Sequence, residues 1–241
     1  MSRVRPQPWL KAAIEVALPA HCVSCGNAAR RGAAFCRDCR RRLPRIRGAR
    51  CEVCSEPFSA ADEGLVCTNC RGRNFYFVAT IASYRANGEI RELIHRLKYN
   101  RELHLRRPLG WLLRRNLLDD RLRGVKFDGL VPVPLHPLRE REREFNQSRL
   151  LAEELAQRAK VPVWDDLKRI RATETQTHFD RHERMQNLRG AFVLRRMDRV
   201  PGQTLALIDD VFTTGSTLNE CARVLLEAGA RTVWALTVAR A

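Results

Sequence analysis

An apolar run that ends in two adjacent carboxylates constrains the fold of this chain more than any other feature. Residues 205–208 read Leu-Ala-Leu-Ile, Asp209 and Asp210 follow closely, and a loop rich in hydroxyl groups occupies residues 213–217 before a helical pattern begins. Four apolar residues in a row suit a strand buried on both faces of a parallel sheet. The carboxyl end of such a strand is where open α/β sheets bind ligands. Loop hydroxyls, Gly215 and the first N–H groups of the next helix can together bind a phosphate group.

This stretch resembles the phosphoribosyl-pyrophosphate (PRPP) motif of the type I phosphoribosyltransferases. The resemblance implies that Asp209 and Asp210 hold the ribose 2′- and 3′-hydroxyls and act as catalytic residues. It also implies that the 5′-phosphate is wrapped by Thr213, Thr214, Gly215, Ser216 and Thr217. The simpler alternative is a strand that ends in a helix cap. A cap needs one Asp, Ser or Thr, however, and not two carboxylates followed by this whole loop.

Eight of the nine cysteines fall in four C-x-x-C pairs, and two such pairs complete one tetrahedral zinc site. Residues 20–72 are therefore expected to form two zinc ribbons. The first would use Cys22, Cys25, Cys36 and Cys39, and the second Cys51, Cys54, Cys67 and Cys70. Interleaved pairing also fits the spacing. Disulfides or redox pairs are the rival interpretation, but the chain shows neither a secretory signal nor a βαβ context around any pair. Closed Cys₄ sites are structural and keep no position open for a substrate.

The chain is strongly basic, with 44 Lys and Arg against 27 Asp and Glu and a formal charge of +17. Two zinc ions bound by eight thiolates would lower this value to about +13. Residues 30–50 hold nine arginines and one acid, Asp38. This density suits contact with nucleic-acid phosphates. A solvated basic linker explains it equally well.

The N-terminal residues 1–19 alternate apolar and charged side chains and predict a short amphipathic helix. No stretch approaches the roughly 20 apolar residues needed to cross a bilayer, and no cleavable leader is evident before the first cysteine. We therefore expect no membrane span and a cytoplasmic location.

Residues 74–241 alternate strand and helix patterns, which predicts a doubly wound, mainly parallel α/β sheet. The first strands are expected within residues 75–84, one helix at about 103–122, and a last strand at 232–238 at or near a sheet edge. A short strand at 130–134 carries two prolines. One helix is expected from residue 135 to about 159.

Residues 130–147 narrow the resemblance to the ComF/GntX-like competence family, which joins a zinc ribbon to a phosphoribosyltransferase domain. The shared blocks are Val-Pro-Val-Pro-Leu at 131–135 and Phe-Asn-Gln at 145–147. The resemblance implies a pyrophosphate loop at 133–139, with PRPP contacts from Val133, Arg139, Arg143, Asn146 and Gln147. Glu144 stands where the family has glycine. It would either obstruct the close approach of a polyphosphate or lie on the outer face of the helix.

The polar segment at residues 167–192 corresponds to the mobile hood that closes over the reacting centre in the transferases. The family block matches Arg169, Thr173, Gln176, Arg184 and Asn187. The resemblance implies that Gln176 contacts PRPP and that Arg184 stabilises the departing pyrophosphate as a catalytic residue. His178 and His182 have the spacing of a metal pair, but no acidic third ligand converges on them.

The resemblance implies two alternative functions. One is a phosphoribosyltransferase that uses PRPP and Mg²⁺, with an unknown acceptor and a role in DNA uptake during natural transformation. The alternative is a non-catalytic competence factor that associates with single-stranded DNA and with competence or recombination proteins. In that case the PRPP fold serves as a binding or sensing module, and catalysis has been lost.

Overall fold

The computed structural model describes residues 21–58, 66–171 and 188–241. Contacts within the chain divide it into two compact units, residues 1–43 and residues 44–241. The first unit contains helix α2 (Arg37–Arg42), whose N-cap is Cys36. The N-terminal helix expected at 1–19 lies outside the described residues. Among the described helices, none is long and apolar enough to cross a membrane.

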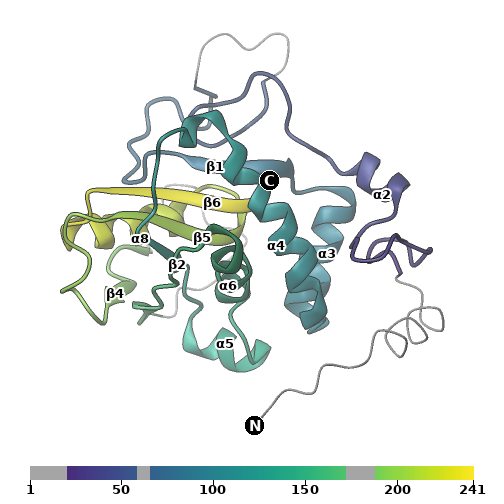
Figure 1. Cartoon of the computed structure of the whole chain (residues 1–241). Helices are drawn as coiled ribbons and strands as arrows, with labels where there is room; N and C mark the ends of the chain where they lie inside the picture. Colours follow the sequence, from purple (N-terminus) through teal and green to yellow (C-terminus); the bar gives the residue numbers. More distant parts are fainter. Residues whose placement is uncertain (1–20, 59–65, 172–187) are drawn as a thin grey trace. The chain divides into compact units, whose positions relative to one another are not determined.

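A four-stranded parallel sheet forms the centre of the second unit (Figure 1). Its strands are β1 (Thr80–Arg85), β2 (Gly129–Pro132), β5 (Thr204–Phe212) and β6 (Thr232–Arg240), in the order β1-β6-β5-β2. All three pairings are parallel, which confirms the predicted fold class. A small antiparallel pair lies apart from them: β3 (Leu167–Arg169) with β4 (Phe192–Leu194).

The last strand lies near an edge of the sheet, as predicted, because its neighbour β1 is the edge strand. β6 itself is paired on both sides, by β1 and by β5. Only its first three residues alternate between buried and partly exposed, and every residue from Ala235 to Arg240 is buried. The polar Thr237 is fully buried, and its hydroxyl donates to the carbonyl of Ala239.

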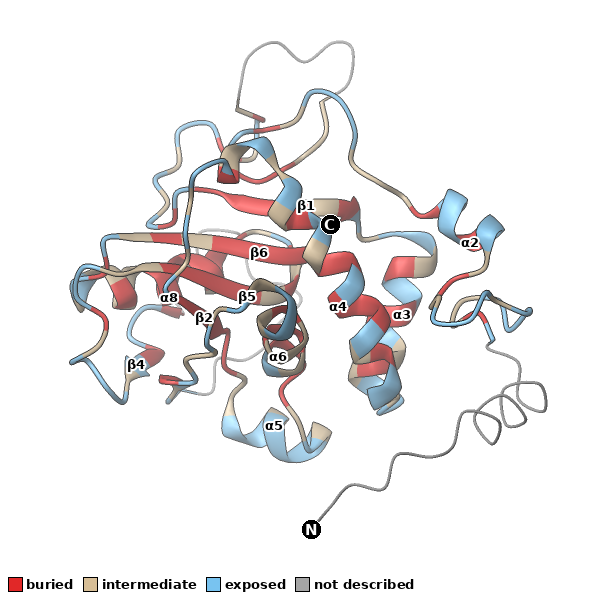
Figure 2. Cartoon of the chain, in the orientation of Figure 1, coloured by how far each residue is buried: buried red, intermediate tan, exposed pale blue. Residues whose placement is uncertain are grey.

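The helices cover both faces of the sheet, as a doubly wound fold requires. They are α3 (Gly88–Tyr99), α4 (Arg106–Arg114), α5 (Pro137–Arg143), α6 (Gln147–Ala159) and α8 (Ser216–Glu227). Because successive strand residues point to opposite faces, Leu205 and Leu207 of β5 pack in the cluster that contains α8. Helices α4 and α6 pack against the same sheet, and the central strands β5 and β6 are largely buried (Figure 2). Ile208 of β5 is fully buried.

Two predicted helices are broken. The expected helix at 103–122 is α4 preceded by a 3₁₀ turn, η1 (Leu103–Leu105), and followed by η2 (Arg115–Leu118) and η3 (Asp120–Leu122). Extended backbone at Asp119 separates the last two, and its side chain caps η3. The expected helix from 135 to 159 is divided into α5 and α6, because Glu144 adopts a left-handed conformation (φ +68°) and Asn146 an extended one.

The second cysteine group belongs to the same compact unit as the sheet. Cys51, Cys54, Cys67 and Cys70 are all buried, in one cluster with core residues of the sheet and α8. The chain between this group and the sheet is not a strand: residues 75–79 form a loop, and β1 begins only at Thr80.

Candidate functional site

Eight of the nine cysteines gather in two groups, Cys22/Cys25/Cys36/Cys39 and Cys51/Cys54/Cys67/Cys70. Within each group the sulfur atoms lie within 4.8 Å of one another. The Sγ atoms of Cys25 and Cys36 are 3.8 Å apart, and those of Cys54 and Cys67 are 3.6 Å apart. Four sulfurs bound tetrahedrally at about 2.3 Å from zinc are separated by about 3.8 Å. The two groups therefore fit two structural Cys₄ zinc sites with consecutive rather than interleaved pairing.

The acidic pair lies at the carboxyl end of β5, the site predicted from the apolar run. Asp210 is buried and Asp209 is partly exposed. Each carboxylate contacts the start of α6: Ser148 Oγ donates to Asp209 Oδ1 over 2.8 Å, and Gln147 Nε2 donates to Asp210 Oδ1 over 3.3 Å. The two carboxylates are thus oriented by a helix that is distant from them in sequence.

Lys98, in the last turn of α3, forms an ion pair with Asp210. Burial alone would raise the pKa of Asp210, but the Lys98 ammonium outweighs it and holds that pKa below its ordinary value. Burial likewise acts to lower the pKa of Lys98, and the Asp210 carboxylate outweighs it and raises that pKa. The pair is therefore ionised on both sides at neutral pH.

Asp209 differs from its neighbour because the ion pair of Lys98 is formed with Asp210. Burial, followed by the negative charge of Asp210, raises the pKa of Asp209 from 3.8 to about 7. The hydrogen bonds from Ser148 and from the Asp210 backbone N–H act in the opposite direction and are too weak to prevail. Adjacent carboxylates with such different environments are typical of functional sites.

The loop between β5 and α8 has the form that a phosphate site needs. Gly215 is the N-cap of α8 and has φ +78°, a backbone conformation that residues with a side chain rarely adopt. A Cβ added there would also lie 2.6 Å from the Phe212 ring. The hydroxyls of Thr214 and Ser216 are 3.0 Å apart. The loop therefore groups hydroxyls and first-turn N–H groups at the N-terminus of a 12-residue helix.

The α5–α6 junction brings further predicted residues to the acidic pair. Asn146 caps α6 and donates to the carbonyl of Val133 over 3.0 Å. Arg143 donates to Gln147, the residue that contacts Asp210. Arg139 lies on α5, and its charge, after burial, helps to lower the pKa of Arg169.

Glu144 is the C-cap of α5, where its backbone is left-handed. Its positive φ explains why glycine suits this position, since glycine adopts such a conformation freely. Its side chain is 67 % exposed and forms an ion pair with Arg101, which also donates to the Glu142 carbonyl. Its charge therefore faces solvent and a partner cation.

Of the expected hood residues, Arg169 lies at the end of β3. Gln176 and Arg184 lie outside the described residues, as do Thr173, His178, His182 and Asn187. The sequence reasoning also missed Lys98 and Ser148. Lys98 directly follows Leu97, the last buried position of the amphipathic α3, and a cation at that border is a weak signal that becomes meaningful only once α3 is placed beside β5.

Comparison with known proteins identifies the family of this chain. The chain is 36% identical to the DNA utilization protein YhgH of Salmonella typhimurium over 84% of this chain and 89% of that protein. The chain belongs to the ComF competence family. It is also 35% identical to competence protein F of Haemophilus influenzae, over 62% of this chain and 67% of that protein. Competence protein ComFC of Bacillus subtilis is 32% identical, over 80% and 78% of the two chains.

Family models agree with the two parts of this ComF-family chain. A double zinc ribbon domain matches residues 13–71, and a phosphoribosyl transferase domain matches residues 146–241. The second match covers α6, β5, α8 and β6, the elements that hold the acidic pair and the hydroxyl-rich loop at 213–217.

Proposed function

We propose that this ComF-family protein binds PRPP at the carboxyl end of β5. The observation that carries the proposal is the pair Asp209 and Asp210, oriented by α6 and α3 directly before the hydroxyl-rich loop. In this assignment the two carboxylates accept hydrogen bonds from the ribose hydroxyls. The 5′-phosphate is held by residues 213–217.

The pyrophosphate is assigned to the opposite side of the acidic pair, along the loop at 133–139 and the start of α6. Val133, Arg139, Arg143, Asn146 and Gln147 are its proposed contacts, with Gln176 and Arg184 completing the set. Oxygen donors are the ligands that Mg²⁺ prefers, and the two carboxylates supply them beside the phosphate loop. When bound, Mg²⁺ would neutralise charge on the pyrophosphate.

The proposed reaction is a transfer of the phosphoribosyl group. A nucleophilic atom of the acceptor attacks C1 of the ribose, and the bond from C1 to the pyrophosphate oxygen breaks as pyrophosphate leaves with the bonding electrons. Asp209 and Asp210 hold the sugar in position, and arginines near the pyrophosphate stabilise the leaving group. The acceptor is left open.

Isothermal titration with PRPP and Mg²⁺ at low salt tests the binding step. We expect wild-type protein to bind and Asp209→Ala to bind at least tenfold more weakly, whereas Asp120→Ala, an exposed carboxylate on η3, should bind like wild type. If wild-type protein takes up no PRPP, the binding assignment is wrong. If PRPP binds but no pyrophosphate is released with nucleobase, nucleotide or DNA acceptors, the sensing alternative is favoured.

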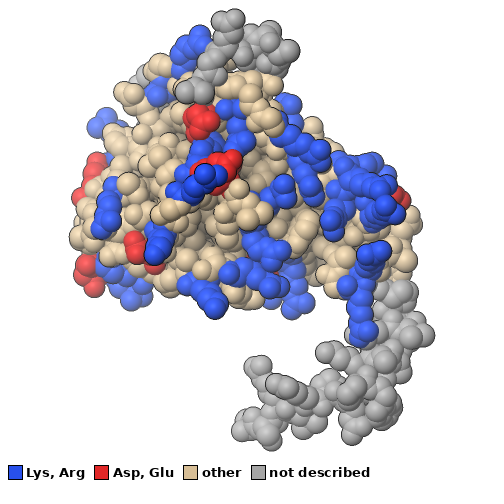
Figure 3. Space-filling model, turned by 45° about the horizontal axis from the view of Figure 1, so that its top comes forward, with Lys and Arg blue, Asp and Glu red and all other residues tan. Residues whose placement is uncertain are grey.

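The relatives favour a second role, in handling DNA that has entered the cell. Their names refer to competence and DNA utilization. Within the described part of unit 1, six arginines are exposed: Arg30, Arg31, Arg37, Arg40, Arg41 and Arg42. Lys and Arg side chains also spread over the face shown in Figure 3, with few acidic side chains between them. We propose that the basic unit 1 contacts the phosphates of single-stranded DNA.

The salt dependence of single-stranded DNA binding tests this role. Six phosphate contacts would give a slope of about −4 in a plot of log K against log salt, from about −0.7 per contact. Replacing Arg40, Arg41 and Arg42 by Ala should make the slope less steep by about 2. A control that removes the same charge from exposed positions of unit 2 (Arg123, Arg158 and Arg231) should leave it unchanged. Equal effects of the two triple variants would contradict the assignment to unit 1.

A further inference from the structure

The chain that follows the second cysteine group contacts the loop at 213–217, the proposed phosphate loop. Arg73, three residues after Cys70, donates from Nη2 to the carbonyl oxygen of Thr214 over 3.1 Å. The same guanidinium donates from Nη1 to the carbonyl of Asn69, which lies between the last two cysteines, over 3.3 Å. One side chain therefore joins the backbone of the Cys67–Cys70 knuckle to the backbone of the phosphate loop.

This contact fixes a peptide group that matters for phosphate binding. The carbonyl of Thr214 and the N–H of Gly215 belong to one planar trans peptide and point in opposite directions. Because Arg73 holds the carbonyl, it also sets the direction of the Gly215 N–H, away from the knuckle. A free loop of hydroxyl residues and glycine would lose this orientation, since Gly215 has few conformational limits of its own.

The segment that follows Arg73 supports the same loop. The Phe75 ring lies 4.7 Å from the Arg73 guanidinium and would lie 3.4 Å from a Cβ at Gly215. The N–H of Tyr76 donates to Asn219 Oδ1 in the first turn of α8 over 2.6 Å. Phe77 packs edge-on against Phe212, with ring centroids 6.2 Å apart. Knuckle, segment and loop are thus packed as one structure.

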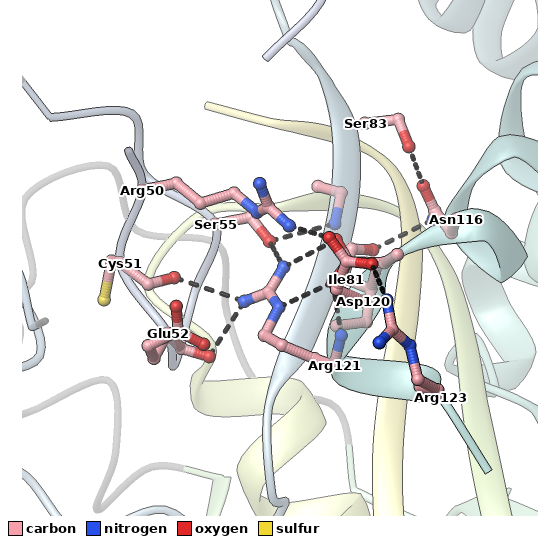
Figure 4. A network of polar contacts seen from close by, with 12 residues as sticks. Arg50, Cys51, Glu52, Ser55, Ile81, Ser83, Asn116, Asp120, Arg121 and Arg123 are labelled. Carbon is pink, nitrogen blue, oxygen red and sulfur yellow. Dashed lines mark hydrogen bonds and ion pairs between the residues drawn. The ribbon is translucent and has the colours of Figure 1, made fainter. Parts of the chain in front are cut away.

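The other half of this Cys₄ group, the knuckle with Cys51 and Cys54, is also anchored by hydrogen bonds. Arg121 of η3 donates to the carbonyls of Cys51 and Glu52 and to Ser55 Oγ (Figure 4). Ser55 Oγ in turn donates to the Thr80 carbonyl of β1 over 2.7 Å. With one knuckle fixed to the sheet in this way, a metal that binds both knuckles also fixes the position of Arg73.

We propose that Arg73 is a positioning residue that transmits the geometry of the second Cys₄ site to the phosphate loop. The inference rests on the proposed function, because the loop is taken to bind the PRPP 5′-phosphate. It assigns the second metal site a role in ligand affinity as well as in stability.

Three variants of the full-length, zinc-loaded protein test the proposal: Arg73→Ala, Arg73→Lys, and Arg71→Ala as the matched control. Arg71 is an exposed arginine of the same knuckle. Three quantities are measured: zinc content, hydrogen exchange of the backbone amides at 213–219 without ligand, and PRPP affinity with Mg²⁺. A hydrogen bond from a charged donor contributes about 1.5–3 kcal/mol, so Arg73→Ala should weaken PRPP binding about tenfold or more. Its zinc content should stay at two ions per chain, and exchange at 213–219 should accelerate.

The conservative variant separates positioning from a general loss of structure. Arg73→Lys keeps a cation that can reach the Thr214 carbonyl, and it should recover part of the affinity and of the exchange protection. Arg71→Ala should match wild type in all three measurements. Exchange that accelerates equally across the β5–β6 pairing, or a loss of zinc in Arg73→Ala, would overturn the positioning role in favour of a structural one. So would unchanged exchange at 213–219.

The exchange measurement also keeps the two proposals apart. If wild-type protein fails to bind PRPP, the proposed function is wrong, whereas local acceleration of exchange at 213–219 in Arg73→Ala still supports the connection. If wild type binds PRPP and Arg73→Ala binds equally well, the connection is wrong and the proposed function stands.

Discussion

Replacing Asp209 by Asn should stabilise the ligand-free protein at alkaline pH, although it removes a proposed ribose contact. Burial and the neighbouring Asp210 raise the pKa of Asp209 from 3.8 to about 7 in the folded protein. Between these two values the folded state holds a proton that the unfolded state has lost. Stability therefore falls as pH rises, by 1.36 kcal/mol for each pH unit. Over the interval from 3.8 to about 7, the total loss is about 4 kcal/mol.

Asparagine does not ionise, so Asp209→Asn avoids this loss. It also keeps the shape of the side chain and can still contact Ser148. The structural thiolates restrict the experiment to pH values at which zinc remains bound, so the useful range is pH 5.5 to 8. Within it the stability advantage of Asp209→Asn over wild type should grow by about 2 kcal/mol, because about 1.5 pH units of the interval lie above pH 5.5.

Urea unfolding with saturating zinc, at several pH values, measures this difference. Asp120→Asn, which alters an exposed carboxylate paired with Arg123, is the control and should show no such trend. The same Asp209→Asn protein should bind PRPP more weakly than wild type. A stability difference that is constant within about 0.5 kcal/mol from pH 5.5 to 8 would refute the reasoning about Asp209.

Three further changes have definite expected results. Lys98→Met should destabilise the protein by about 3–5 kcal/mol, since it leaves Asp210 buried without its cation, and a double-mutant cycle in urea with Asp210→Asn should show coupling above ~1 kcal/mol. Glu144→Gly should stabilise the folded protein slightly, by no more than about 1 kcal/mol. Relief of the left-handed conformation should exceed the loss of an exposed ion pair. Thermal unfolding measures this difference. Cys54→Ser should lower the stability of residues 44–241 by ~4 kcal/mol or more, whereas Cys25→Ser should leave exchange protection of the sheet unchanged.

The parts of the site that could be predicted from sequence are those that form from neighbouring residues. The strand at 205–208, the two carboxylates and the loop at 213–217 are contiguous, so an apolar run and a few polar residues were enough to indicate them. The cysteine groups were equally accessible, because C-x-x-C spacing is set by the geometry of one metal ion. In both cases short-range constraints decide the structure.

The surroundings of the carboxylates could not be predicted in the same way. Ser148 and Gln147 are 61 and 63 residues away from the carboxylates that they contact, and Arg73 is 141 residues away from Thr214. Such contacts depend on which helix lies beside which strand, and periodicity carries no information about that. Residue pattern alone likewise does not distinguish a polar residue exposed at an edge from a buried Thr237 that bonds to the backbone of its own strand.

The helix break at residue 144 shows how a departure from the family pattern can be interpreted once the backbone is known. From sequence, the glycine of the family was explained by close approach to a ligand, with a position of Glu144 on the outer face of the helix as the alternative. The φ of +68° and the exposed side chain instead favour backbone conformation as the reason. The consequence of Glu144 is then a modest cost in backbone energy, partly offset by Arg101, and no obstruction of the acidic pair.

The charges around Asp209 also connect stability to ligand binding. The cation Lys98 is paired with Asp210. Ionisation of the Asp209 carboxylate therefore remains costly. Ribose hydroxyls placed against that carboxylate would donate hydrogen bonds to its ionised form and lower its pKa. Binding would therefore recover energy that the free protein loses as pH rises from 3.8 to about 7. The same excess of negative charge that destabilises the free site would favour a group rich in hydroxyl donors.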